Sequence, residues 1–289
     1  MSNIDEVKEL LARTTKEVER NKWNFYKKYP YSMSKIVNQL KPEFDQQGMA
    51  QKTHDKHFYD RTSIYYGKTV DEILQMWAKK SELGKMYGKI LDDYIGLVLE
   101  RKATEQQLAD FLAGLDKTAN LKCNTWMRFY RSFIGPEAGD NRIEFICREM
   151  TMCDDRYGLN GRLDALFGFK DKALLIDWKN TEKITTESRF ETMLGPLYKY
   201  DNCSLNEYTI QLYSYVYMLT HDYGLDRRIV PLIINITLNE HLTFRPIIPY
   251  SDTLMEECFD YAIAKIKKAK EDANKQQADD SVKINKESE

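Results

Sequence analysis

The stretch that decides the fold runs from Arg162 to Lys179 and reads RLDALFGFKDKALLIDWK. Two apolar runs flank the segment Gly168–Lys172, which combines a glycine with charged residues. That pattern is typical of a β-hairpin, with an apolar strand on each side of a polar turn. Centring the turn between Lys170 and Asp171 fixes which residues of the two strands face each other.

In this register Asp164 lies across from Asp177, while the apolar side chains of the two strands also meet, Leu166 with Leu175 and Phe167 with Leu174. Opposed Cβ atoms of an antiparallel pair are about 4.5–5.5 Å apart. Two carboxylates at that distance repel each other unless a cation lies between them or one of them takes a proton. Lys179 follows Asp177 by two residues and therefore projects from the same face. Arg162 is expected opposite Lys179.

Glu149 is the third acid of the pattern. It ends the strand-like run Ile143–Thr151, and the polar turn Cys153–Gly158 connects this run to the Asp164 strand. A hairpin about that turn places Glu149 beside Asp164, where it is either a third metal ligand or an ion-pair partner of Arg148 or Arg162. Three carboxylates suit a hard ion such as Mg²⁺ or Mn²⁺ rather than zinc.

This set of residues has the chemistry needed to hydrolyse a phosphodiester. Such hydrolysis requires an activated water and neutralisation of the charge that develops on the phosphoryl group. We expect Asp164 and Asp177 to hold the metal, with the backbone carbonyl of Trp178 as a further ligand. Lys179 would orient the water or stabilise the transition state. The pattern does not choose between one metal ion and two.

Two polar residues on the following helix belong to the same pattern. Gln211 and Tyr215 are four residues apart and so share one helix face. The helix is expected to open with Ser204 and Glu207 as a capping box and to run to about Asp222. Gln211 and Tyr215 would then project toward the charged end of the sheet and hydrogen-bond the lysine, an acid or the substrate phosphate.

Three motifs carry a family resemblance: G-R-L-D at 161–164, I-D-W-K-N at 176–180 and Y-T-I-Q-L-Y-S-Y at 208–215. They resemble the motifs of the PD-(D/E)XK nuclease superfamily, and more narrowly those of its RecB-like branch. Within that branch they look like stand-alone phage and large-virus nucleases and mitochondrial genome maintenance exonucleases. The resemblance covers roughly residues 31–219. It implies metal ligands at Asp164 and Asp177, a catalytic lysine at Lys179, and supporting roles for Gln211 and Tyr215.

The resemblance also implies an α/β fold, in which helices flank a mixed central sheet and the N-terminal half is helical. In the upstream half, Tyr31–Ser34, Phe44-Asp45, Trp77 and Gly88–Asp92 follow the family's order. Asp92 stands where the family usually has a histidine that ligates a metal. The metal ligand that the family has on this helix is therefore Asp92, Asp93 or absent in this chain.

Cysteine spacing bears on the cofactors. Many relatives in this branch carry an iron–sulfur cluster held by closely spaced cysteines, but the five cysteines of this chain include no C-x-x-C pair. We therefore expect neither an iron–sulfur cluster nor a zinc site.

The expected function is a metal-dependent DNA nuclease, more specifically an exonuclease that acts on DNA ends or single strands in recombination, replication or repair. The alternatives are a structure-specific endonuclease or an RNase of the same fold, and a nucleic-acid-binding or assembly protein that does not cut. No G-x-x-x-x-G-K-[ST] motif is present, so a helicase, like a recombinase or a single-strand-binding protein, would be a separate chain.

The chain is expected to form one nuclease domain over residues 1–272, with a mainly helical part at 1–135, a catalytic sheet core at 140–250 and a disordered tail at 273–289. Helices are predicted over Ile4–Lys28, Val70–Glu100, Thr104–Phe133 and Asp252–Asp272. The segments Ile229–Leu238 and Leu242–Ile248 are predicted to be a strand pair completing the sheet.

A net charge of −2 excludes a protein that binds nucleic acid through bulk positive charge, so contacts must come from local patches. Aromatic and basic residues are interleaved between positions 22 and 31. A second candidate is Tyr198, in the loop between Lys179 and the helix that carries Gln211. The substrate contacts that we predict are Arg162, Trp23, Tyr26, Lys27, Lys28 and Tyr198. The competing interpretation is that Trp23 and Phe25 belong to the core and the lysines are only solvated.

No apolar run is long enough to span a membrane, and the first residues do not form a signal peptide. Five cysteines without a pairing pattern suit a reducing compartment. These features predict a cytoplasmic protein, in a bacterium or in a cell infected by a phage or virus.

Overall fold

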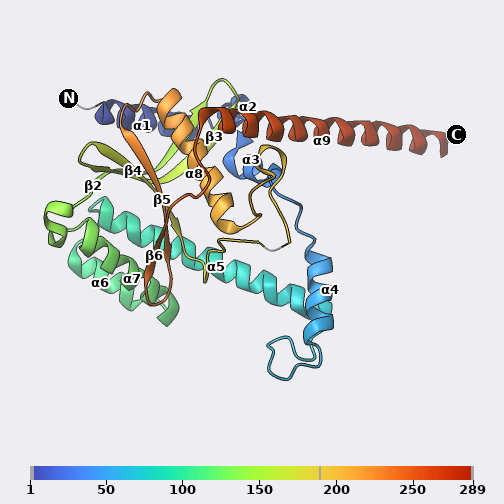
Figure 1. The fold of residues 1–289 in the computed structure, drawn as a ribbon, viewed down its shortest axis with the longest axis horizontal. Helices are drawn as coiled ribbons and strands as arrows, with labels where there is room; N and C mark the ends of the chain where they lie inside the picture. The colour runs from blue at the N-terminus through green and yellow to red at the C-terminus, as the bar shows by residue number, and fades with distance from the viewer. Residues whose placement is uncertain (1–2, 189, 288–289) are drawn as a thin grey trace.

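The structure is a computed structural model that describes residues 3–188 and 190–287; residues 1, 2, 189, 288 and 289 of the expected domain and tail lie outside it. Figure 1 shows a mixed central sheet with helices packed on both faces and a helical N-terminal half. The predicted fold class is therefore confirmed.

Helices make up most of the N-terminal half, interrupted by one short strand, β1 (Tyr31–Ser32). In chain order they are α1 (Ile4–Arg20), α2 (Lys22–Lys28), α3 (Met33–Gln39), α4 (Gln46–His57), α5 (Val70–Leu99), α6 (Glu105–Ala113) and α7 (Lys117–Phe133). Short 3₁₀ turns follow at Pro136–Asn141 and, later in the chain, at Gly195–Leu197.

Two predicted helices are each broken in two. The segment predicted as one helix over Ile4–Lys28 bends at Asn21, whose φ of −147° and ψ of 64° are not helical and whose side chain accepts a hydrogen bond from the Asn24 backbone. Asparagine competes with the helix by such local bonds. The segment predicted over Thr104–Phe133 is interrupted after Ala113, and Asp116 then caps the new helix.

Six strands of the described residues form one sheet, in which β1 is joined by β2 (Glu144–Asp154), β3 (Leu159–Phe169), β4 (Lys172–Lys179), β5 (Arg228–Ile236) and β6 (His241–Phe244). The order is β1-β3-β4-β5-β6, and β2 pairs with β3. The β1–β3 and β4–β5 pairs are parallel, and the remaining pairs are antiparallel.

The predicted hairpin register is confirmed, since Leu166 pairs with Leu175 and Phe167 with Leu174. The turn is formed by Lys170 and Asp171, and Lys170 has the positive φ of 54° that a tight hairpin turn demands. The ladder ends at the pair Ala165–Ile176, directly before the two aspartates.

The expected pairing of Arg162 with Lys179 is wrong. Arg162 pairs instead with Thr151 of β2 on the other edge of β3. On the edge that faces β4, the first residues of β3 pair with β1 and the last five with β4. The segment Gly161–Asp164 between them has no strand partner on that edge, and the ends of β3 and β4 therefore open a space between them.

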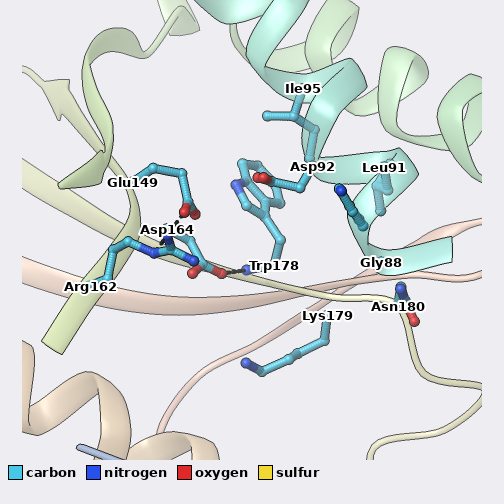
Figure 2. Close-up of a pocket in the computed structure, with 11 residues that line it drawn as sticks. Gly88, Leu91, Asp92, Ile95, Glu149, Arg162, Asp164, Trp178, Lys179 and Asn180 are labelled. Atoms are coloured by element: carbon cyan, nitrogen blue, oxygen red, sulfur yellow. Dashed lines mark hydrogen bonds and ion pairs between the residues drawn. The ribbon is translucent and has the colours of Figure 1, made fainter. Parts of the chain in front are cut away.

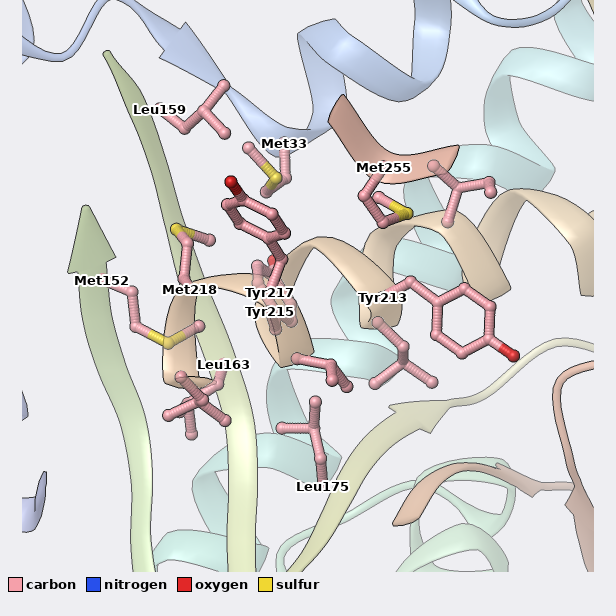
Figure 3. Close-up of a cluster of buried hydrophobic side chains, with 14 of the residues drawn as sticks. Met33, Met152, Leu159, Leu163, Leu175, Tyr213, Tyr215, Tyr217, Met218 and Met255 are labelled. Carbon is pink, nitrogen blue, oxygen red and sulfur yellow. The ribbon is translucent and has the colours of Figure 1, made fainter. Parts of the chain in front are cut away.

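The two faces of the sheet bury separate cores. One core contains side chains of α1, α3, α8 (Ser204–His221) and α9 (Asp252–Glu287), and Figure 3 shows α8 packed across the strands with Tyr215 and Met218 among methionine and leucine side chains. The other core joins α5 and α7 to the opposite face. Along β4, Leu175 belongs to the first core and Ile176 to the second, as strand alternation requires.

Helices α8 and α9 differ from prediction at their ends. The N-cap of α8 is Cys203, and Ser204 exchanges hydrogen bonds with Thr185 instead of forming a capping box. Helix α9 continues to Glu287 rather than stopping at Asp272. The segment after Asp272 lacks proline and glycine and is rich in residues that favour helix, so nothing in its sequence ends the helix there. Of the helices described, none combines the length and the apolar composition needed to cross a bilayer.

Candidate active site

A cavity of about 310 Å³ lies between α5, the middle of β2 and β3, and the end of β4. Its lining includes acids from two strands and one helix, together with the strand end that carries Lys179. Figure 2 shows the carboxylates of Asp92, Glu149 and Asp164 turned toward one space beside the Trp178 ring. The helix α5 thus closes the cavity that the diverging strands leave open.

Asp164 sits where β3 loses its regular alternation. Leu163 belongs to the core beneath α8, whereas Ala165, two residues later, belongs to the core beneath α5. The strand therefore twists locally at Asp164 and brings its side chain to the open edge. There one carboxylate oxygen accepts a hydrogen bond from the Trp178 backbone N–H at 2.8 Å.

Asp177 is almost completely buried, with 2% of its surface exposed. The Lys179 Nζ lies 2.7 Å from one carboxylate oxygen, but neither oxygen accepts a hydrogen bond of good geometry from the described residues. Burial raises the pKa of Asp177, although the charge of Lys179 lowers it. For Asp164, burial and then the charge of Asp177 raise the pKa well above its usual value. A cation between the two carboxylates would remove both penalties.

Lys179 stays charged in this environment. Burial alone lowers the pKa of its amine, but the carboxylates of Asp177 and Asp164 outweigh burial and the pKa is raised. The ammonium group also lies 4.5 Å from the centre of the Tyr208 ring. As predicted, Lys179 and Asp177 project from the same face, so the lysine can bring a fixed positive charge to the acids.

Glu149 forms the ion pair that the sequence left as one of two alternatives, with Arg162 Nε 2.8 Å from its carboxylate. The flanking pairs Arg148–Ala165 and Met150–Leu163 set it opposite Asp164. Its φ of 52° is unusual for a residue with a long side chain and marks local strain of the kind found at functional sites. Burial and the charge of Asp92 raise the pKa of Glu149, opposed by Arg162.

Asp92 of α5 lines the same cavity, whereas Asp93 does not. The Asp92 carboxylate pairs with the Arg148 guanidinium, which also donates to the Asp92 backbone carbonyl at 3.2 Å. That guanidinium rests on Gly96, where an added Cβ would strike it. The α5 helix is thus fastened to β2 at the level of the acids.

Gln211 and Tyr215 contact each other on α8, with Gln211 Nε2 3.2 Å from the Tyr215 hydroxyl. The Tyr215 hydroxyl is close enough to Asp177 and Asp164 for their charges to raise its pKa, an effect second to burial and to the opposing bond from Gln211. A Cβ at Gly161 would come within 2.5 Å of the Tyr215 ring. The glycine of G-R-L-D is therefore explained by the approach of Tyr215 to the backbone of β3.

Of the predicted substrate contacts, Arg162 lines the cavity and the other five do not. Trp23 is 79% exposed, so the interpretation that it belongs to the core is wrong, whereas the neighbouring Phe25 is buried. Lys28 forms an ion pair with Asp155 at 2.9 Å. Tyr26, Lys27 and Tyr198 lie on the surface. A role of these exposed residues in binding stays a prediction.

Three residues around the cavity were missed by sequence reasoning. They are Arg148, which holds Asp92, Tyr208, which faces Lys179, and Asn180, whose side chain donates to the Gly84 carbonyl at 3.2 Å. Arg148 alone had a usable signal, because a charged residue within a strand of apolar alternation needs a partner.

The residues present are a partial shell for a divalent cation. Within residues 3–188 and 190–287, no three acids, cysteines or histidines gather closely enough to surround an ion by themselves. The Asp177 oxygens nevertheless lack hydrogen bonds while buried next to Asp164. Mg²⁺ commonly binds through one or two carboxylates and keeps several waters. Asp164 and Asp177 fit that mode.

Comparisons with known proteins give little further information. No family model matches the chain, and no curated protein matches its sequence. Among solved structures, the chain is similar to a crystal structure of a protein from Eubacterium rectale named "Putative exonuclease", with 10% sequence identity and a TM-score of 0.40. The alignment covers 86% of this chain and 83% of that one. A likeness at this level carries no argument about activity.

Proposed function

We propose that this chain is a Mg²⁺- or Mn²⁺-dependent nuclease of the PD-(D/E)XK type, and specifically an exonuclease that acts on DNA ends or single strands. The observation that carries the proposal is the buried pair Asp164 and Asp177 with Lys179 beside it. Burying two carboxylates together is costly, and within the described residues no hydrogen bond of good geometry to Asp177 offsets this cost. Asp164 lines the cavity, whereas Asp177 is buried and does not line it, and both have raised pKa values. Clustered acids with raised pKa values beside a cavity are the usual mark of a functional site.

Asp164 and Asp177 would hold the cation, with the Trp178 carbonyl as a further ligand and Asp92 and Glu149 facing its bound waters. When bound, the ion would lower the pKa of a water and neutralise charge on the phosphoryl group. Lys179 remains protonated, so it acts on the substrate as a positive charge rather than as a base. Its ammonium group would stabilise the charge that builds up in the transition state.

The other polar residues position this machinery. Tyr215 and Gln211 support the opened edge of β3 next to Asp164. Arg162, which is two-thirds exposed and held by Glu149, is available to a substrate phosphate at the mouth of the cavity. Glu149 would orient Arg162 through their ion pair as long as Glu149 does not bind the cation.

The test is digestion of end-labelled single-stranded and duplex linear DNA, beside closed circles, in Mg²⁺ and in Mn²⁺. We expect linear DNA to be degraded, circles to be spared, and EDTA to stop the reaction. Lys179→Ala should lower the rate by about 10²–10³-fold, as does loss of one group that stabilises transition-state charge. Lys170→Ala, at the exposed hairpin turn far from the acids, is the matched control and should retain full activity.

Other outcomes would redirect the proposal. Nicked circles would identify an endonuclease, and faster cleavage of RNA than of DNA would identify an RNase. Binding of nucleic acid without cleavage, under all metal conditions, would contradict the catalytic proposal and favour a binding or assembly protein.

A further inference from the structure

A second and larger cavity, of about 740 Å³, adjoins the acid cavity. Its walls come from α5, from the start of α7, from residues 180–183 and from the turn between β5 and β6. Cavities of roughly 300–1,000 Å³ hold ligands the size of a nucleotide. Asn180 lines both cavities and is the ridge between them.

Lys122 gives this cavity its electrostatic character. It is 8% exposed, and its ammonium group donates only to backbone carbonyls, those of Asn180 at 2.8 Å and Ile236 at 3.4 Å. No carboxylate in the described part of the chain lies within ion-pair distance of it. Burial lowers the pKa of the Lys122 amine, and the charge of Glu182 opposes this effect. An anion bound next to the amine would favour its charged form.

The rest of the lining adds positive charge and an aromatic ring. Lys183 and Lys80 lie at the rim, and the single acid among the lining residues, Glu182, pairs with Lys80 at 2.9 Å. Tyr87 of α5 forms part of the wall one residue before Gly88, which belongs to the acid cavity. An aromatic ring beside uncompensated lysines is the combination that binds an unpaired base and its phosphate.

The wall that separates the two cavities is held firmly. Asn235 is fully buried, and its side chain exchanges hydrogen bonds of 3.1 Å with the backbone N–H and carbonyl of Thr181. The Asn180 side chain is tied to α5 at Gly84, and its backbone to Lys122. Asn180, the residue after Lys179, therefore already lines the second cavity, and its position is fixed by these hydrogen bonds.

We propose that the second cavity binds the nucleotide next to the cleaved phosphodiester on a single strand, with Tyr87 stacking on its base and Lys122 and Lys183 contacting its phosphate. This inference rests on the proposed function, because it places the substrate strand across Asn180 from the acids. Duplex DNA is disfavoured, because a paired base has no free face to stack on Tyr87.

The experiment compares two substrates and two variants. Methyl p-nitrophenyl phosphate has one scissile phosphodiester and no nucleobase, so it can use only the acid cavity, whereas a single-stranded oligothymidylate reaches both. For Tyr87→Ala and Lys183→Ala we expect KM for the oligonucleotide to rise about tenfold with kcat unchanged. Kinetics on the small ester should equal those of the wild type. Tyr59→Ala and Lys170→Ala, which change the same residue types outside both cavities, are the controls.

Binding measured without cleavage separates this inference from the proposed function. In EDTA, fluorescence anisotropy with labelled oligothymidylate should show weaker binding by Tyr87→Ala. Lys183→Ala should reduce the slope of log affinity against log salt by about 0.7, as expected for one lost phosphate contact on a single strand. These losses would support the subsite even if the wild type cleaves nothing.

Three results would overturn the inference. They are unchanged oligonucleotide binding and KM in both variants, an equal loss on the small ester and the oligonucleotide, and a lower thermal midpoint that accounts for the lost binding. Duplex DNA that competes as well as single strands would also contradict it.

Discussion

The electrostatics of single residues set the character of the acid cavity. Asp177 is buried with its oxygens short of hydrogen bonds, and Lys179 is the cation that faces it. Removing one member of a buried ion pair leaves the other charge uncompensated. Replacing either Asp177 or Lys179 alone should therefore lower the stability of the fold, in addition to any effect on catalysis.

Gly161 gives a prediction at this scale. Gly161→Ala should lower the free energy of unfolding by about 1–3 kcal/mol, because its Cβ would lie 2.5 Å from the Tyr215 ring and 3.0 Å from Met33 Cγ. Urea denaturation of the two proteins measures the difference. The control is Gly84→Ala, since a Cβ there has no neighbour within 4 Å and alanine favours helix. Equal stability of Gly161→Ala and the wild type would contradict the contact with Tyr215.

The residues that sequence reasoning could and could not find differ in kind. Asp164, Asp177 and Lys179 were found because a two-residue turn and apolar alternation fix a hairpin register. Asp92 lines the cavity as the resemblance implied, but its partner Arg148 comes from a distant strand. The charge of Arg148 within an apolar strand signals that it needs a partner, but which residue becomes that partner depends on how α5 crosses the sheet.

At the scale of elements, the pairing of β4 with β5 holds the end of β4, where Lys179 is located. The two strands are parallel and paired along their whole common length, as far as Lys179 and Asn235. Beyond this point Asn235 replaces the ladder with side-chain hydrogen bonds to Thr181. The end of β4 is thereby kept in place where strand pairing stops.

Asn235→Ala tests this joint. It should cost about 1–3 kcal/mol of stability, because it leaves polar groups of Thr181 without partners, and it should lower nuclease activity by more than the loss of folded protein. Asn235→Asp keeps the acceptor but loses the donor, and we expect an intermediate effect. Activity measured far below the melting temperature separates the two contributions. Full activity in Asn235→Ala would show that the strand end does not need this support.

Element boundaries were predicted less well than element types. The break at Asn21 was not predicted, and the capping box predicted at Ser204 and Glu207 is absent, with Cys203 as the N-cap. In each case a polar side chain forms a hydrogen bond that the predicted helix pattern did not include. Thr185 competes with the capping box for Ser204, and Thr185 is brought there by the loop after β4. Helix α5, in contrast, was predicted within one residue, because apolar residues at helical spacing begin at Val70. The structure adds that a capping box at Thr69 and Glu72 begins the helix.

At the scale of the whole molecule, the paired acids couple folding to pH and to metal. The raised pKa values mean that the folded state holds more protons than the unfolded state above the ordinary carboxyl pKa. Stability contributed by these protons is present at low pH and is lost as pH rises through the raised pKa values. A bound cation would replace the protons.

We therefore predict that, in EDTA, the melting temperature falls as pH rises from 5 to 8, and that Mg²⁺ raises it more at pH 8 than at pH 5. Asp177→Asn should remove the effect of Mg²⁺. Asp222, whose pKa is raised to about 7 by burial and by Asp154, adds a slope in the same direction that Mg²⁺ should not change. Scanning calorimetry of Asp177→Asn and Asp222→Asn separates the two. Stabilisation by Mg²⁺ that is equal at all pH values would contradict the acid pair as its site.

The two-residue turn at Lys170 and Asp171 has a consequence for how this chain tolerates change. Exposed turns usually accept added or lost residues as readily as replaced ones. Here one extra residue would shift every residue of β4 by one position if the turn keeps two residues, and Ile176 or Trp178 rather than Asp177 would come to face Asp164. Any residue that can adopt the positive φ of Lys170 should thus be accepted in this turn, whereas a change in the number of turn residues should not. A variant library should therefore show substitutions there without surviving insertions or deletions.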